Sequence, residues 1–186
     1  MAYIDQPRRP HNVMLKVVRV LLHGPAGHIT TYAVLDDGSM RTMVLTPAVQ
    51  QLKISGEDSI LLSTVRQDAF RCEGQSIDIQ VSPVDSSNIK YNIKGAFTAD
   101  NLQLSEYTYP IAALQKRWPH LRGVGLPLIN KAAPLILIGS DYADLIIPQQ
   151  PVKFGPSGAP VAIHTKLGWT LQGPAGILKE QFSEQK

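Results

Sequence analysis

The sequence predicts a mainly β protein: a closed, mostly antiparallel β barrel with one or two short helices. Short runs of β-branched and apolar residues recur along the chain, which is typical of strands. Fourteen glycines and fourteen prolines are distributed among these runs and provide turns. The chain has 186 residues, of which 44% are hydrophobic, enough for one domain with a packed core.

The expected strands follow one another in an order that favours hairpins. The first two are joined by Gly24–Gly27, a run of turn residues. Two later segments alternate polar and apolar residues with period 2, as half-buried strands do. The segments predicted to be strands are Leu15–Leu22, His28–Leu35, Met40–Leu45, Ser59–Val65, Ser76–Val81, Asn88–Phe97, Ala133–Ile138, Val161–Thr165 and Gly168–Leu171.

Helix signals are few. Thr46 and Pro47 fit the N-cap and the first helical position of a short helix that ends near Leu52. A second helix is expected over Tyr109–Trp118, because Pro119 stops it. These short helices accompany the barrel and do not change the fold class.

One domain is expected, with an extension at each end. Residues 1–14 are polar and contain proline, so they are interpreted as a flexible N-terminal extension. Residues 15–174 form the predicted domain, and residues 175–186 form a polar tail. The single cysteine, Cys72, allows no internal disulfide.

The composition also limits the compartment and the partners. The N-terminus lacks the apolar core of a signal peptide, and the longest apolar stretch, Pro134–Ile138, is too short to span a bilayer. We therefore expect a cytoplasmic or intracellular protein without a membrane partner. The net charge of +3 is scattered along the chain, which disfavours nucleic acid as a partner but leaves a nucleic-acid-associated structural domain as a weaker alternative.

The candidate chemistry lies in the segment from Asp36 to Ser39. It follows an apolar strand and precedes another, so the Asp36 carboxylate is expected at a strand tip. Gly38, two residues later, gives the backbone freedom for a tight turn around that carboxylate. Taken alone, Asp36-Asp37-Gly38-Ser39 favours an ordinary turn over a catalytic one, because Asp and Gly dominate turns. About a hundred residues downstream, a second apolar strand ends at Gly139 and leads into a short helix.

These two pieces, in this order, resemble the retropepsin-like aspartic peptidases. In that family an apolar strand enters Asp-Ser/Thr-Gly, and a later apolar strand ends in Ile-Gly before a helix. More specifically, the chain is similar to the aspartic peptidase domain of Pao/BEL-type retrotransposon polyproteins. The blocks that carry this resemblance are Val34–Ser39, Trp118–Gly123, Leu137–Tyr142 and His164–Pro174.

The resemblance implies an aspartic endopeptidase that processes a retroelement polyprotein. One Asp-x-Gly turn is half a site, so a second copy of the chain must meet it at a two-fold axis. The two Asp36 carboxylates would then share one proton and activate a water that attacks an extended peptide. Neither a metal nor a cofactor is expected in this chemistry.

The family also implies a flap, a hairpin that closes over the substrate and excludes water. The polar segment Gln67–Gly74, between two alternating strands, is predicted to be the loop of this flap.

Asp37 departs from the family, which has Ser or Thr at this position and uses the hydroxyl for a hydrogen bond across the dimer. A carboxylate donates no hydrogen bond unless it is protonated. Two copies of Asp37 would add negative charge beside the two Asp36 carboxylates, unless the side chain turns to solvent. Activity that prefers acid is one expectation. The alternative is an inactive retropepsin-like domain that serves as a peptide-binding or dimerisation module.

Other chemical sites are disfavoured by spacing. The five histidines and Cys72 lack the spacing of a zinc site. Ser157 lies in Gly-Pro-Ser-Gly, which is not the motif of a hydrolase nucleophile. Asp141 and Asp144 lie where the downstream helix starts, and a favourable interaction with the helix dipole is their expected role.

Overall fold

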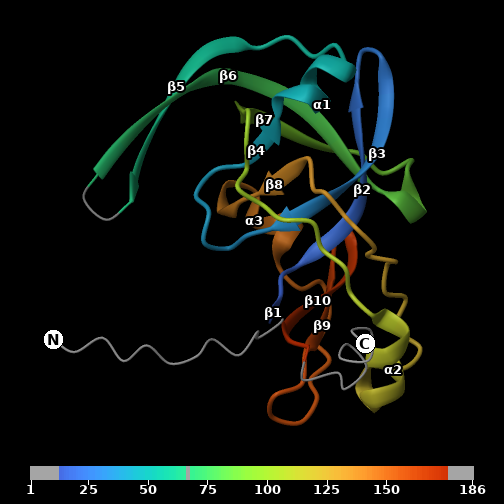
Figure 1. Cartoon of the computed structure of the whole chain (residues 1–186). Coiled ribbons are helices and arrows are strands. Elements are labelled where there is room, and N and C mark those ends of the chain that lie inside the picture. The colour runs from blue at the N-terminus through green and yellow to red at the C-terminus, as the bar shows by residue number, and fades with distance from the viewer. Residues whose placement is uncertain (1–12, 66–67, 176–186) are drawn as a thin grey trace, which may run out of the picture.

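The computed structural model describes residues 13–65 and 68–175 of the chain (Figure 1). They form a β barrel with a smaller lobe beneath it, and this second lobe combines the two ends of the described chain with the segment around α2 (Ile111–Arg117). Each helix in this part of the chain is too short or too polar to cross a membrane.

Six strands close into the barrel, as the sequence predicts. The ring closes because the first strand pairs with both its hairpin partner and the sixth strand. Four pairings are antiparallel, whereas β3–β8 and β4–β7 are parallel. In ring order the strands are β2 (Val17–Gly24), β3 (Gly27–Leu35), β8 (Ile136–Ile138), β4 (Met43–Leu45), β7 (Tyr91–Ala99) and β6 (Asp68–Pro83).

The two central strands are shorter than predicted. β8 begins at Ile136 and not at Ala133, and β4 begins at Met43 and not at Met40. Each of these two strands is hydrogen-bonded to a neighbouring strand on both sides. All three residues of β8 are buried, so both faces of this strand are covered and a short apolar run suffices. In β4 only Val44 is fully buried.

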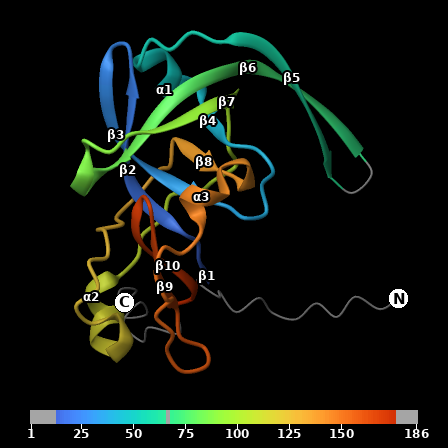
Figure 2. The same cartoon turned by 180° about the vertical axis from the view of Figure 1, so that it is seen from behind.

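A long hairpin extends from the barrel. β5 (Glu57–Val65) pairs with the first part of β6 from Glu57↔Ser76 out to Val65↔Asp68, and the hairpin arches away from the barrel in Figures 1 and 2. The predicted polar loop over Gln67–Gly74 is therefore wrong for its described residues, since Asp68–Gly74 continue the strand. Pairing with β5 provides backbone hydrogen bonds for this segment, whatever the polarity of its side chains. Residue 67 lies outside the described residues.

The lower lobe holds a second, three-stranded sheet. Its strand order is β1 (Val13–Met14), β10 (Gly168–Pro174) and β9 (Val161–Thr165), so the last predicted hairpin is confirmed. Val13 and Met14, at the end of the expected extension, form β1, whereas residues 1–12 and 176–186 lie outside the described part.

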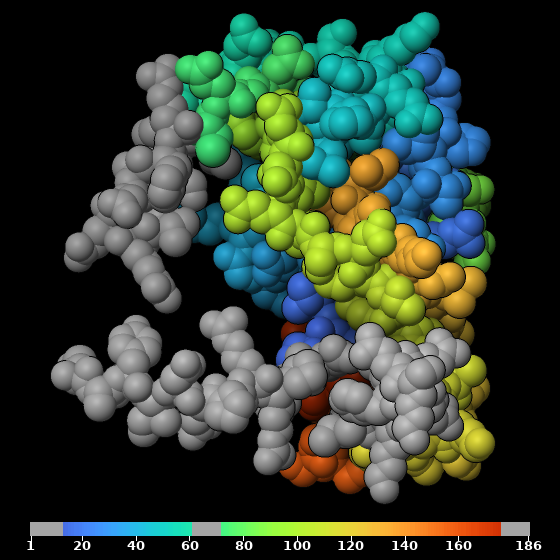
Figure 3. All heavy atoms as spheres, viewed as in Figure 1, coloured from blue at the N-terminus to red at the C-terminus, as the bar shows by residue number. Residues whose placement is uncertain are grey.

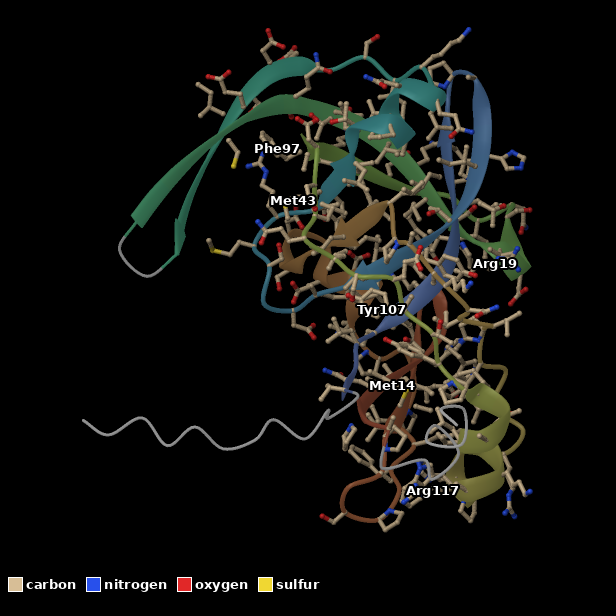
Figure 4. All side chains as sticks on the ribbon, viewed as in Figure 1. Met14, Arg19, Met43, Phe97, Tyr107 and Arg117 are labelled. Carbon is tan, nitrogen blue, oxygen red and sulfur yellow. The ribbon has the colours of Figure 1, made fainter. Side chains whose placement is uncertain are left out.

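Each lobe has its own apolar core. The barrel is filled by Val20, Leu22, Ile93 and similar side chains that point inward from alternate strand positions. The lower core packs the small sheet against α2 (Ile111–Arg117), and the partly buried Trp118 and Trp169 border it. Figure 4 shows Phe97 and Met43 in the barrel, and Met14 and Tyr107 below them.

The remaining helices are short. They are α1 (Thr46–Gln51), α3 (Ala143–Ile146) and the 3-10 turns η1 (Val84–Ser86), η2 (Pro119–Leu121) and η3 (Ser140–Tyr142). The prediction that Thr46 caps α1 is wrong, because the N-cap is Leu45 and no side chain caps the helix. The Thr46 hydroxyl donates instead to Asp100 at 2.9 Å.

Candidate functional site

The Asp36 carboxylate lies at the end of β3, as predicted. The backbone N–H of Gly38 donates to Asp36 Oδ1 at 2.9 Å, and the N–H of Ser39 donates to the Asp36 carbonyl at 3.2 Å. These bonds close a tight turn. Asp36 remains partly exposed, while Leu35 just before it is buried in the barrel core. The side chain is thus fixed at the barrel surface and is not packed inside.

The turn is tied to the end of β8. The N–H of Asp36 donates to the Ile138 carbonyl at 2.9 Å, and the N–H of Ser140 donates to the Ser39 carbonyl at 2.8 Å. The Ser140 hydroxyl donates to the carbonyl of Asp37 at 2.9 Å. The Asp36 turn and the end of the downstream apolar strand are therefore in direct contact.

Thr42 and Asp141 form a second tie between the same segments. Both the N–H and the hydroxyl of the buried Thr42 donate to the Asp141 carboxylate, at 2.9 and 2.8 Å. The Gly139 N–H donates to the Thr42 hydroxyl oxygen at 3.1 Å. Asp141 lies at the helix start as predicted, but its carboxylate also binds Thr42 and connects the two blocks. Asp144 likewise starts α3, and its carboxylate pairs with Lys166 at 2.8 Å.

Gly139 is required by close approach of the backbone. A Cβ atom at this position would lie 2.7 Å from the Ser39 carbonyl oxygen and 2.9 Å from the Arg41 carbonyl oxygen. Both contacts are with backbone, which cannot swing away as a side chain can. The glycine that ends the second apolar strand therefore allows β8 to reach the Asp36 turn.

A cavity of about 440 Å³ opens beside the Asp36 carboxylate. Its lining comes from four segments: the connection between β1 and β2, the end of β3 with its turn, the segment between β7 and α2, and β10. Figure 3 shows the third of these, residues 100–110, crossing the face in view toward α2. The lining residues are Leu15, Lys16, Val34, Leu35, Asp36, Asp37, Gly38, Leu104 and Gln172.

Lys16 forms an ion pair with Asp37 inside this cavity. The Lys16 side chain is 6% exposed, whereas that of Asp37 is 60% exposed. An ammonium group at such a position requires a partner, because burial disfavours an isolated charge. The acid that departs from the family pattern is therefore paired with a cation of the same chain.

The backbone on both sides of Lys16 is fixed. The Tyr109 hydroxyl accepts from the Leu15 N–H and donates to the Leu15 carbonyl, each at 2.9 Å. On the other side, the buried Thr170 hydroxyl donates to the Val17 carbonyl at 2.9 Å. Burial raises the pKa of Tyr109 above its ordinary value, which keeps this hydroxyl protonated.

Sequence reasoning missed Lys16, Thr42 and Tyr109. Lys16 could have been singled out from the sequence, since it is a lone charge in the apolar run from Met14 to Val18. No local sequence pattern indicates the roles of Thr42 and Tyr109, because their hydrogen-bond partners lie 99 and 94 residues away along the chain. Within the described residues, no three His, Cys, Asp or Glu side chains gather as metal ligands would.

Comparison with protein-family models, with curated proteins and with solved structures finds no match to this chain.

Proposed function

We propose that the protein is an aspartic endopeptidase whose active site forms when two copies each contribute Asp36. The observation that carries this proposal is the position of the Asp36 carboxylate: partly exposed at a strand end, bordering a cavity, and tied to the strand-Gly139 block. Such a constellation is what the resemblance to retropepsin-like peptidases implies, and the Pao/BEL-type resemblance suggests a retroelement polyprotein as the natural substrate.

The proposed chemistry needs two Asp36 carboxyl groups close to one water. Two carboxylates at such a distance do not both ionise, so one keeps a proton. The ionised group takes a proton from the water as the oxygen attacks the peptide carbonyl. The protonated group hydrogen-bonds to that carbonyl, and a proton passes to the nitrogen as the C–N bond breaks. No metal and no covalent intermediate enter this scheme.

Within each copy, the rigid turn supports this role. The Gly38 N–H fixes the orientation of the Asp36 carboxyl group by donating to Oδ1. The backbone bonds to Ile138 and Ser140 fix the turn against β8. Precise placement of the reacting carboxylate reduces the entropy that must be lost in the transition state.

The β5–β6 hairpin is the proposed flap. It extends from the barrel on the side where the β3–β4 connection lies in both Figure 1 and Figure 2. A two-stranded arm joined to the barrel through β6 can move at its outer part while its base stays paired with β2 and β7. Its backbone would lie over an extended peptide and exclude water from the two acids.

Cleavage of an unstructured protein at about pH 4–6 tests the proposal, since such acid pairs titrate near that range. The parent should cleave, and Asp36→Asn should abolish cleavage while keeping the fold. Asp85→Asn, an exposed acid in η1, is the matched control and should cleave like the parent. Absence of cleavage by the parent, or equal cleavage by Asp36→Asn, would refute the enzyme.

A non-catalytic peptide-binding or dimerisation module is the second candidate, and Asp37 in place of Ser or Thr is the observation that favours it. Activity that appears in Asp37→Ser, with none in the parent at any pH, would support this candidate over the active enzyme. The Lys16–Asp37 ion pair argues for the enzyme, because it offsets the charge on which this candidate depends.

A further inference from the structure

We infer that Lys16 is a positioning residue: its buried ammonium group offsets the charge of Asp37, which allows two active-site turns to meet at the two-fold axis. This inference rests on the proposed function and assigns a role to a residue outside the Asp36 turn. It explains how a chain with an acid after Asp36 can still assemble a full site.

The charge balance is the first argument. With Ser or Thr after the catalytic acid, each turn would carry one ionisable carboxyl group. Here Asp36 and Asp37 supply two carboxyl groups and Lys16 supplies one ammonium group, so the net charge is the same as in a turn with Ser or Thr and no lysine. Without Lys16, two copies would bring four carboxyl groups together, and like charges in a partly buried site repel strongly.

Among the described residues, no other charged group lines the cavity and could take over this role. Lys16, Asp36 and Asp37 are the charged members of its lining. The segment between β7 and α2 contributes Leu104, and β10 contributes Gln172, neither of which titrates. Charge compensation for Asp37 on this lining therefore comes from Lys16.

The placement of Lys16 is the second argument. Its carbonyl accepts from the Leu35 N–H at 2.9 Å, which sets it opposite the residue before Asp36. Tyr109 fixes the backbone of Leu15 and Thr170 that of Val17, so the lysine is restrained from both sides. A long side chain is normally mobile and loses much of the benefit of an ion pair to entropy. Burial and these restraints reduce that loss for Lys16.

A second ion pair of the same chain provides a matched control. Lys166 pairs with Asp144 at 2.8 Å, and its side chain is 33% exposed, compared with 6% for Lys16. Neither Lys166 nor Asp144 lines the cavity beside Asp36. Lys166→Met therefore removes a Lys–Asp pair without changing the charge at the site.

The experiment measures the dimer dissociation constant and peptide cleavage for the parent, Lys16→Met, Lys16→Met/Asp37→Ser and Lys166→Met, at pH 7 and pH 5. Lys16→Met should weaken the dimer at pH 7 by at least about tenfold, since it leaves Asp37 without a partner. The double variant should recover to within about threefold of the parent, because both charges are removed together. Lys166→Met should match the parent.

The following outcomes overturn the inference. Equal dissociation constants and cleavage for Lys16→Met and the parent would show that the ammonium group does not act on assembly. A double variant no better than Lys16→Met would show that Lys16 acts through packing, and so would failure of both variants to fold. A parent that does not self-associate also overturns it. A parent that dimerises with this dependence on Lys16 but cleaves nothing contradicts the proposed function and supports the inference.

Discussion

The backbone N–H of Asp36 donates to the carbonyl oxygen of Ile138 at 2.9 Å, which joins the ends of two strands that lie about a hundred residues apart in the chain. β3 and β8 run parallel up to this point, from Ala33↔Ile136 to Leu35↔Ile138. The Asp36 turn is therefore an extension of the barrel itself. Substitutions at the end of β8 should therefore alter the position of the Asp36 carboxyl group.

Gly139→Ala should destabilise the protein. The added Cβ would lie 2.7 Å from the Ser39 carbonyl oxygen, and that backbone cannot move without disturbing the turn. We expect a loss of about 1–3 kcal/mol in the free energy of unfolding, measured by urea denaturation. Gly125→Ala is the control, because its nearest neighbour would be a Trp169 atom at 3.9 Å. Equal effects of the two substitutions would contradict the close-approach argument.

Thr42→Val keeps the size of the side chain but removes its hydroxyl. The Gly139 N–H and one Asp141 oxygen would then lose their partner in a region where Thr42 is fully buried. The expected loss in the free energy of unfolding is about 1–3 kcal/mol. Thr46→Val removes a hydroxyl bond to Asp100 at an exposed site and should change stability much less. A larger effect at Thr46 would count against the proposed tie.

Tyr109→Phe tests the restraint beside Lys16. The substitution leaves both the N–H and the carbonyl of Leu15 without the hydroxyl that now satisfies them. Because Tyr109 is buried, the free energy of unfolding should fall by about 1–3 kcal/mol. Tyr32→Phe, which removes an exposed 3.4 Å bond to the Leu128 carbonyl, is the comparison and should be close to neutral. If neither variant changes the free energy of unfolding, Tyr109 does not restrain the backbone beside Lys16.

His23 should make stability depend on pH. Burial, with contributions from Lys90 and His28, lowers the pKa of His23 below its ordinary value of 6.5. The unfolded chain therefore binds a proton more readily than the native state. Stability is fully present above pH 6.5 and declines as the pH falls toward the lowered pKa. The decline in the free energy of unfolding should be shallower in His23→Gln, and parallel curves would exclude this histidine as a cause.

The strands of the barrel could be predicted from the sequence where neighbouring residues alone determine the structure. The β2–β3 hairpin was predicted because two runs of β-branched and apolar residues flank the turn residues Gly24–Gly27. The β9–β10 hairpin was predicted as well. The predicted loop is wrong for residues 68–74, because a polar composition does not by itself distinguish a loop from a strand. Cross-strand pairing with β5 outweighs that preference, as it does in many two-stranded arms.

The candidate site was predictable in part. Asp36 and Gly139 could be found because their motifs are local. The Lys16–Asp37 pair could not, since its register depends on how β2 meets the end of β3, and no pattern along the chain encodes that contact. The role of Asp141 shows the same limit: its helix-start position was visible, whereas its bonds to Thr42 required the fold.

Activity of mixed dimers tests the central claim most directly. Parent and Asp36→Asn chains are co-refolded at a fixed total concentration, so that they pair at random, and cleavage is measured against the parent fraction. If both copies must supply an Asp36 carboxyl group, activity follows the square of that fraction and falls to about a quarter at equal mixing. If one Asp36 per dimer sufficed, activity would fall only to about three quarters, and if each copy acted on its own it would fall to about half. Either result would contradict the two-carboxylate account.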